Sequence, residues 1–105
     1  MKIDWLEPWT QIERPEEREA IQAELHSELG GSHPLFGLSV VALARRYDQD
    51  DVLFELADGR VAEVHLTWSH TPERDSHWPR TAIFASAAVW VEEQMRPLHE
   101  ETRPF

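Results

Sequence analysis

The segment from Leu38 to Trp68 constrains the fold most strongly, because apolar stretches alternate in it with two short polar turns. Three strands are expected in this segment, over residues 38–47, 52–56 and 61–68. The second turn contains Asp58-Gly59, a pair that is typical of β-hairpins. Since turns this short join antiparallel neighbours, the segment predicts an antiparallel meander.

The apolar pattern of the hairpin also predicts its register. A two-residue turn at Asp58-Gly59 would pair Leu56 with Val61 and divide the apolar side chains of the two strands between two faces. A three-residue turn with a glycine bulge pairs Leu56 with Arg60 instead. We expect this second register, because it gathers the apolar side chains on one face: Val52, Phe54, Leu56, Ala62, Val64, Leu66 and Trp68. It places on the opposite face Glu55, Glu63, His65 and Thr67.

A helix is expected before this segment, beginning near Pro15, because proline suits the first position of a helix. Its apolar stripe consists of Ile21, Leu25 and Leu29. Gly30-Gly31 follows the stripe and is expected to end the helix, with one of the two glycines in the left-handed conformation.

Two further elements are expected after the meander. Residues 81–85 predict a short fourth strand, although a helix beginning near Thr81 fits the same apolar residues almost as well. Ser86 is a favourable N-cap for a second helix over residues 87–95. We expect Pro97 to end that helix, because proline lacks the N–H that a continuing helix needs.

These elements predict the α+β class: an N-terminal helix, a three- to four-stranded antiparallel meander sheet and a C-terminal helix. Both helices are expected to pack on one sheet face, the apolar face of the hairpin, with the other face partly open to water. Residues 1–105 are expected to form a single domain. Within it, residues 1–13 form an extended arm whose tryptophans lie on the core, and residues 98–105 form a loose tail.

The charge of the chain excludes some classes of partner. Twenty Asp and Glu against ten Lys and Arg give a formal charge of −10. Nucleic acid and anionic membrane surfaces would be repelled, because their binding depends on Lys and Arg. A basic protein partner would be attracted and steered toward this surface.

The absence of cysteine excludes a disulfide framework, a thiolate metal site and a cysteine nucleophile. The segment Met1–Glu7 carries charged residues among the apolar ones, so we do not expect a signal peptide. No run approaches the roughly 20 apolar residues that cross a bilayer. We therefore expect a cytoplasmic protein.

The candidate binding residues lie at the end of the meander and in the loop that follows: His65, Trp68, His70, His77 and Trp78. Imidazoles with nearby carboxylates can hold a transition metal, which makes His65, His70 and His77 the metal candidates. Their spacing matches no metal motif, so a metal is not expected and no cofactor is assigned. The chain has no phosphate loop, dinucleotide turn or nucleophile elbow, and no catalytic residue is assigned.

The sequence DVLFELADGRVAEVHLTWS, followed by HWPRT, resembles a group of small uncharacterised bacterial proteins. The shared features are a strand ending in VHLTW and a downstream WP before a short strand and helix. The resemblance covers about the C-terminal two thirds and implies no known activity, so it transfers no functional residue. It implies that His65, Trp68, Trp78 and Pro79 act together, either in folding or in binding.

The leading functional expectation is a small acidic protein-interaction module without catalytic activity. An inhibitor or immunity-type protein that covers a basic partner is one form of it. The alternative is a metal- or small-molecule-binding protein that uses the His/Trp loop after the third strand. A homo-oligomer, paired through an exposed sheet edge, is compatible with either.

Overall fold

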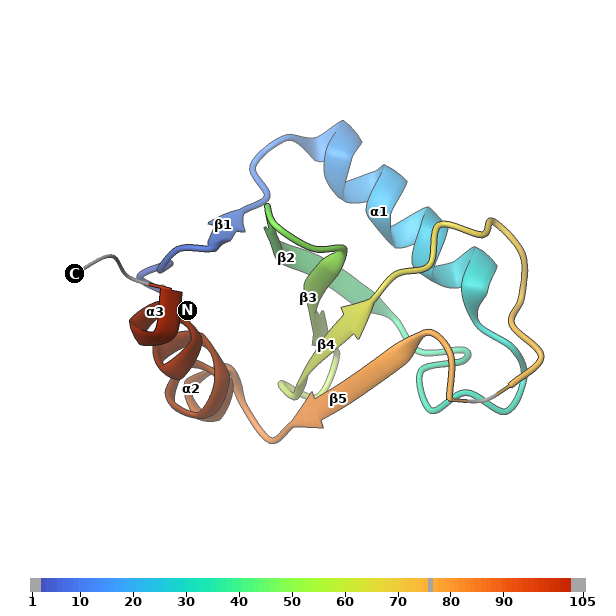
Figure 1. The fold of residues 1–105 in the computed structure, drawn as a ribbon. Coiled ribbons are helices and arrows are strands. Elements are labelled where there is room, and N and C mark those ends of the chain that lie inside the picture. The colour runs from blue at the N-terminus through green and yellow to red at the C-terminus, as the bar shows by residue number, and fades with distance from the viewer. Residues whose placement is uncertain (1–2, 76, 103–105) are drawn as a thin grey trace.

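A computed structural model describes residues 3–75 and 77–102 of the chain. One antiparallel sheet lies at its centre, with helices on both sides (Figure 1). Its strands are β1 (Trp9–Gln11), β2 (Val40–Arg46), β3 (Asp51–Leu56), β4 (Val61–His65) and β5 (Arg80–Phe84). The helices are α1 (Pro15–Glu28), α2 (Ala87–Trp90), the π-helix η1 (Val91–Met95) and α3 (Arg96–Thr102). The expected α+β class is therefore confirmed, with five strands in place of three or four.

The strands follow one another in the sheet in chain order, β1-β2-β3-β4-β5. The predicted hairpin register is confirmed, because Val52 lies opposite Val64 in β3 and β4. The Leu56 amide donates to the Arg60 carbonyl at 2.9 Å, which closes the three-residue turn. Gly59 has a φ of +91°, a conformation that residues with a side chain rarely adopt.

Helix α1 covers one face of the sheet, as predicted. Its Ile21 and Leu25 are buried against Phe54 of β3 and Val64 of β4. The predicted helix end is correct, but its mechanism is not, because neither Gly30 nor Gly31 has a positive φ. A Cβ on Gly30 would lie 2.6 Å from the carbonyl oxygen of Glu73, so close backbone contact requires this glycine.

The expectation that both helices pack on one sheet face is wrong. Leu53 of β3 and Val61 of β4 point away from α1 and are fully buried in a second apolar cluster. Trp90 of α2 covers them, so the C-terminal helices lie on the face that was expected to be open (Figure 1). The apolar run of β3 indicates this arrangement, because a strand buried on both faces carries consecutive apolar residues.

The N-terminal arm lays its tryptophans on this second cluster, as expected. The ring of Trp9 meets the ring of Trp90 edge to face, with 4.9 Å between centroids. The arm also adds β1, which was not predicted, and pairs Trp9 with Arg46 at the edge of β2. Residues 1 and 2 of the predicted arm lie outside the described residues.

The C-terminal region follows the prediction up to residue 95. Residues 80–84 form a strand, which excludes the alternative helix, and the Ser86 hydroxyl accepts a hydrogen bond from the Val89 amide at 3.2 Å. Pro97 does not end the helix. The Arg96 amide bonds to the Val91 carbonyl, a five-residue step that widens the turn and relieves the clash of the proline ring with the preceding turn.

Residues 98–102, expected to be part of a loose tail, are therefore helical, and Leu98 packs against the second cluster. Residues 103–105 of the predicted tail lie outside the described residues. Over residues 3–75 and 77–102, every helix is too short or too polar to traverse a lipid bilayer.

Candidate functional site

The structure does not bring the five predicted binding residues together. His65 lies on the sheet face that carries the C-terminal helices, where its Nδ1 is 2.6 Å from Asp51 Oδ1. Trp68 packs against the cluster beneath α1, on the other face. Each of the three predicted histidines contacts a different carboxylate, so they are separate features rather than one site.

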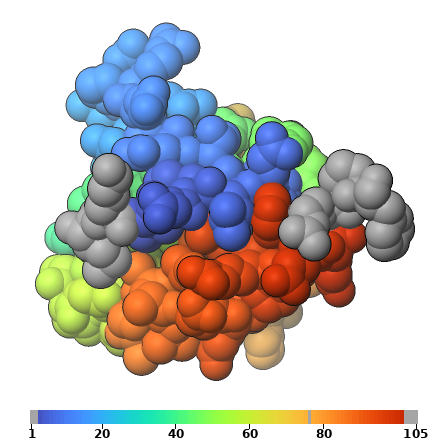
Figure 2. Space-filling view, turned by 90° about the vertical axis from the view of Figure 1, so that its left-hand side faces the viewer, coloured from blue at the N-terminus to red at the C-terminus, as the bar shows by residue number. Residues whose placement is uncertain are grey.

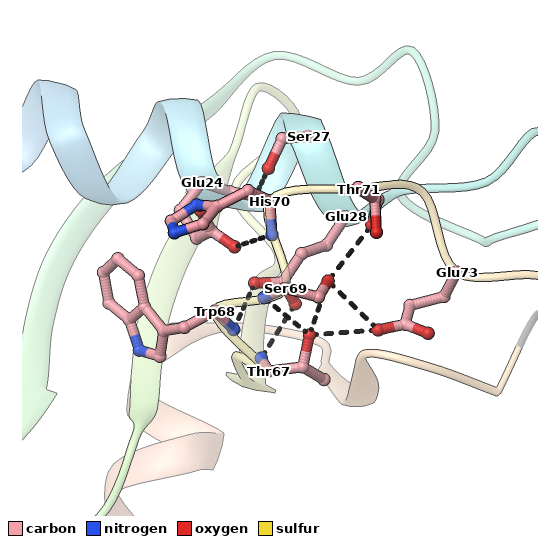
Figure 3. A network of polar contacts seen from close by, with 9 residues as sticks. All are labelled: Glu24, Ser27, Glu28, Thr67, Trp68, Ser69, His70, Thr71 and Glu73. Carbon is pink, nitrogen blue, oxygen red and sulfur yellow. Dashed lines mark hydrogen bonds and ion pairs between the residues drawn. The ribbon is translucent and has the colours of Figure 1, made fainter.

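Two glutamates of α1 hold the start of the His/Trp loop (Figure 3). Glu28 is completely buried, and its two carboxyl oxygens accept hydrogen bonds from the amides of Thr67 and Trp68 at 2.8 and 2.9 Å. Burial, followed by the hydrogen bond to Glu24, raises the pKa of Glu28 to about 7. A protonated Glu28 can donate to Glu24 while it still accepts from the backbone.

Glu24 is the charged member of this pair. Burial alone would raise its pKa, but hydrogen bonds from Glu28 and from the backbone and ring of His70 outweigh burial and lower it. The His70 amide donates to Glu24 Oε2 at 3.1 Å, and the ring Nδ1 contacts Oε1. His70 therefore links the loop to α1, because both its backbone amide and its ring contact Glu24.

The same loop has a strained backbone. Trp68 and His70 have φ values of +57° and +62°, which residues with a side chain adopt only when the surroundings hold them there. Glu73 accepts from the hydroxyls of Thr67 and Ser69 at 3.0 and 3.2 Å (Figure 3). The polar network therefore holds the loop in a conformation with unfavourable φ values at Trp68 and His70. We infer that the role of the network is structural.

His77 and Trp78 lie farther along the loop. The ring of the exposed His77 contacts Asp75 at 2.7 Å, and the Arg80 guanidinium lies 5.5 Å from the centre of the Trp78 ring. The sequence reasoning missed His33, which is buried and donates through Nε2 to the Pro79 carbonyl at 2.9 Å. No local signal marks His33, because its partner lies 46 residues away.

The described part of the chain contains no group of three His, Cys, Asp or Glu side chains placed to hold a metal ion. The metal hypothesis for His65, His70 and His77 therefore receives no geometric support from residues 3–75 and 77–102.

A hollow of about 630 Å³ lies between the N-terminal arm and the C-terminal helices. Figure 2 faces this region, where the blue arm lies directly against the orange and red C-terminal segment. We name this hollow the terminal groove. Its apolar lining consists of Ile3, Leu6, Ala87, Ala88, Val91 and Met95. Its charged lining consists of Asp4, Glu92, Arg96 and Glu100, with His99 beside them.

Three carboxylates and one guanidinium thus surround the apolar lining of the terminal groove, and Arg96 is already paired with Glu92 at 3.2 Å. The sequence did not reveal this groove, because it forms between the predicted arm and the C-terminal segment, a predicted helix over 87–95 followed by a predicted loose tail, and no contact between them was expected. The available sequence signal for the groove was the segment 87–101, which reads as an acidic helix with one apolar side.

Comparison with known proteins identifies no relative: no family model, no curated protein and no solved structure matches the chain.

Proposed function

We propose that this protein is a non-catalytic interaction module whose terminal groove binds a basic, amphipathic segment of a partner protein. The observation that carries the proposal is the composition of the groove, with an apolar lining and three carboxylates around it. A helix that presents apolar residues on one side and Lys or Arg at its margins would satisfy both parts of such a surface.

The charge of the whole chain supports the same class of partner. A formal charge of −10 on 105 residues attracts basic proteins over a distance of about 10 Å at ordinary salt and speeds their association. An inhibitor or immunity-type protein, whose acidic surface covers the basic surface of its target, is the form of this function that we favour. A cytoplasmic location, which the lack of cysteine suits, belongs to the proposal.

The test compares two charge-reversed double variants in affinity capture from a lysate of the native organism. Glu92→Lys with Glu100→Lys alters the terminal groove. Glu16→Lys with Glu19→Lys, on the outer side of α1, is the matched control. Each pair replaces two exposed acids and breaks one exposed ion pair, Glu92 with Arg96 or Glu16 with Arg14. Both variants change the net charge equally, so they separate local recognition from general attraction.

The expected result is a basic protein that the wild type and the α1 control retain at low salt, that higher salt releases, and that the groove variant fails to retain. Equal retention by all three proteins would show that net charge alone attracts the partner and would exclude the terminal groove. A lysate from which the wild type retains no basic protein would remove the proposal.

A further inference from the structure

A polar row crosses three strands on the sheet face that carries the C-terminal helices. Asp51 of β3 lies directly opposite His65 of β4, and His65 lies directly opposite Arg80 of β5. Directly opposed residues of an antiparallel sheet point to the same side, with Cβ atoms about 5 Å apart. One pair farther along, Glu63 lies opposite Ala82 on the same face.

A hollow of about 390 Å³ lies over this row, and we name it the sheet-end pocket. Its size falls in the range of about 300–1,000 Å³ that is typical of small-molecule sites. The side chain of Ala82 is too short to fill the space above β5, and Gln94 of η1 lines the opposite wall. A π-helix placed beside a pocket is common at functional sites, because the widened turn redirects a side chain.

On the basic side of the pocket, the Arg80 guanidinium offers hydrogen-bond donors to a ligand. The Arg80 guanidinium lies over Trp78 and forms no ion pair with any residue in the described ranges. His65 uses Nδ1 to contact Asp51, which leaves Nε2 directed elsewhere on a ring that is 40% exposed. A planar guanidinium of this kind matches a carboxylate through two parallel hydrogen bonds.

The acidic side lies deeper. The Asp51 side chain is 13% exposed, and Glu63 accepts a hydrogen bond from the Trp90 indole at 2.8 Å. Burial, followed by the neighbouring Asp51 carboxyl, raises the pKa of Glu63 to about 7. The cationic groups near them are His65, on Asp51, and Arg46, which is paired with Asp48 and only partly offsets the raised pKa of Glu63. A small ammonium group at the floor of the pocket would add the positive charge that this pair of carboxyl groups can still accept.

We propose that the sheet-end pocket binds a small zwitterion of the α-amino acid class, with its carboxylate on Arg80 and its ammonium group against the carboxyl groups of Asp51 and Glu63. Opposite charges at the two ends of the pocket match the opposite charges of such a ligand and fix its direction. The site is independent of the terminal groove, so the failure of either proposal leaves the other standing.

Binding should also release a proton near neutral pH. An ammonium group beside Glu63 favours the charged carboxylate and lowers its pKa, so the proton that Glu63 holds in the free protein leaves. The titratable groups around Glu63 come from six elements: Asp51, His65, Arg46, Arg80, Glu93 and Glu101. Calorimetry in two buffers of different ionisation enthalpy measures this release.

The experiment screens the twenty L-amino acids by ligand-observed NMR at pH 7 and measures the affinity of the strongest binder. That binder is then compared with its C-terminal amide, which lacks the carboxylate, and its N-acetyl derivative, which lacks the ammonium group. Arg80→Gln removes the carboxylate partner. Arg74→Gln, at an exposed position outside the pocket, is the matched control, and both proteins should remain folded because both arginines are exposed.

We expect Arg80→Gln to weaken binding about tenfold or more, the loss of a charge-assisted hydrogen bond, and Arg74→Gln to bind like the wild type. Both blocked derivatives should bind as weakly as the Arg80 variant or worse. No saturable binding up to about 10 mM of any amino acid would overturn the proposal. Equal affinity for the amide, or an equal loss in both arginine variants, would also overturn it.

Discussion

Replacing Glu28 with glutamine tests the polar network that anchors the His/Trp loop. The wild-type carboxyl group offers one oxygen to the Thr67 amide and the other to the Trp68 amide. Glutamine keeps one oxygen and turns an NH₂ group toward the second amide. That buried amide then lacks an acceptor, which costs about 1–3 kcal/mol of folding free energy.

The size of this loss should depend on pH. The folded-state pKa of Glu28, about 7, is above its ordinary value of 4.5, so the folded protein binds more protons than the unfolded chain between these values. The resulting stabilisation is complete below pH 4.5 and is lost as the pH rises through 7. From pH 5 to pH 8 the wild type should lose about 2–3 kcal/mol through this group.

Glutamine does not titrate, so the Glu28→Gln protein should lack that part of the fall. It should therefore be less stable than the wild type at pH 5 and about equal to it at pH 8. The raised pKa of Glu63 is present in both proteins and cancels in the comparison. The lowered pKa of Glu24 changes stability only at pH values below its ordinary pKa of 4.5, and these lie outside the measured range.

Urea unfolding of both proteins at pH 5, 6, 7 and 8, followed by tryptophan fluorescence, measures the difference. A stability difference that stays constant across this range would refute the raised pKa of Glu28. No difference at pH 5 would refute the two backbone hydrogen bonds.

Three further substitutions test the fold, each by urea unfolding. Gly30→Ala should cost about 1–3 kcal/mol because its Cβ would meet the Glu73 carbonyl, whereas Gly31→Ala, with open space around it, should be nearly neutral; equal effects would contradict the close approach. Leu53→Ala should cost about 2–5 kcal/mol, and a near-zero effect would mean that the second sheet face is open to water. Ser86→Ala should cost about 1 kcal/mol by removing the N-cap, and no loss would contradict that cap.

The hairpin was predictable because the residues that determine its register lie close together in the sequence. Alternation places Phe54 and Val64 on one face, and a slip of one residue would expose all their apolar neighbours. The second apolar face was not deduced, although Leu53 and Val61 were visible as apolar residues. Their burial depends on Trp9 and Trp90 from the chain ends, and no short pattern specifies contacts of that sequence separation.

The candidate sites show the same limit. The sequence singled out His65 and His70 by residue type, but their carboxylate partners, Asp51 and Glu24, could be assigned only once the strands and α1 were in place. Glu28 was visible at the margin of the apolar stripe of α1. Its complete burial follows from the loop that closes over it, and the helical period alone does not predict this.

The most direct test of the proposed function is the dissociation constant of the captured basic partner, measured against salt for the wild type and the two charge-reversed variants. The account predicts a steep loss of affinity with salt for the wild type and the α1 control. It also predicts weak binding by the Glu92→Lys, Glu100→Lys protein at every salt concentration. A dissociation constant that does not change with salt concentration would contradict recognition at the terminal groove. An equal loss of affinity in both variants would contradict it as well.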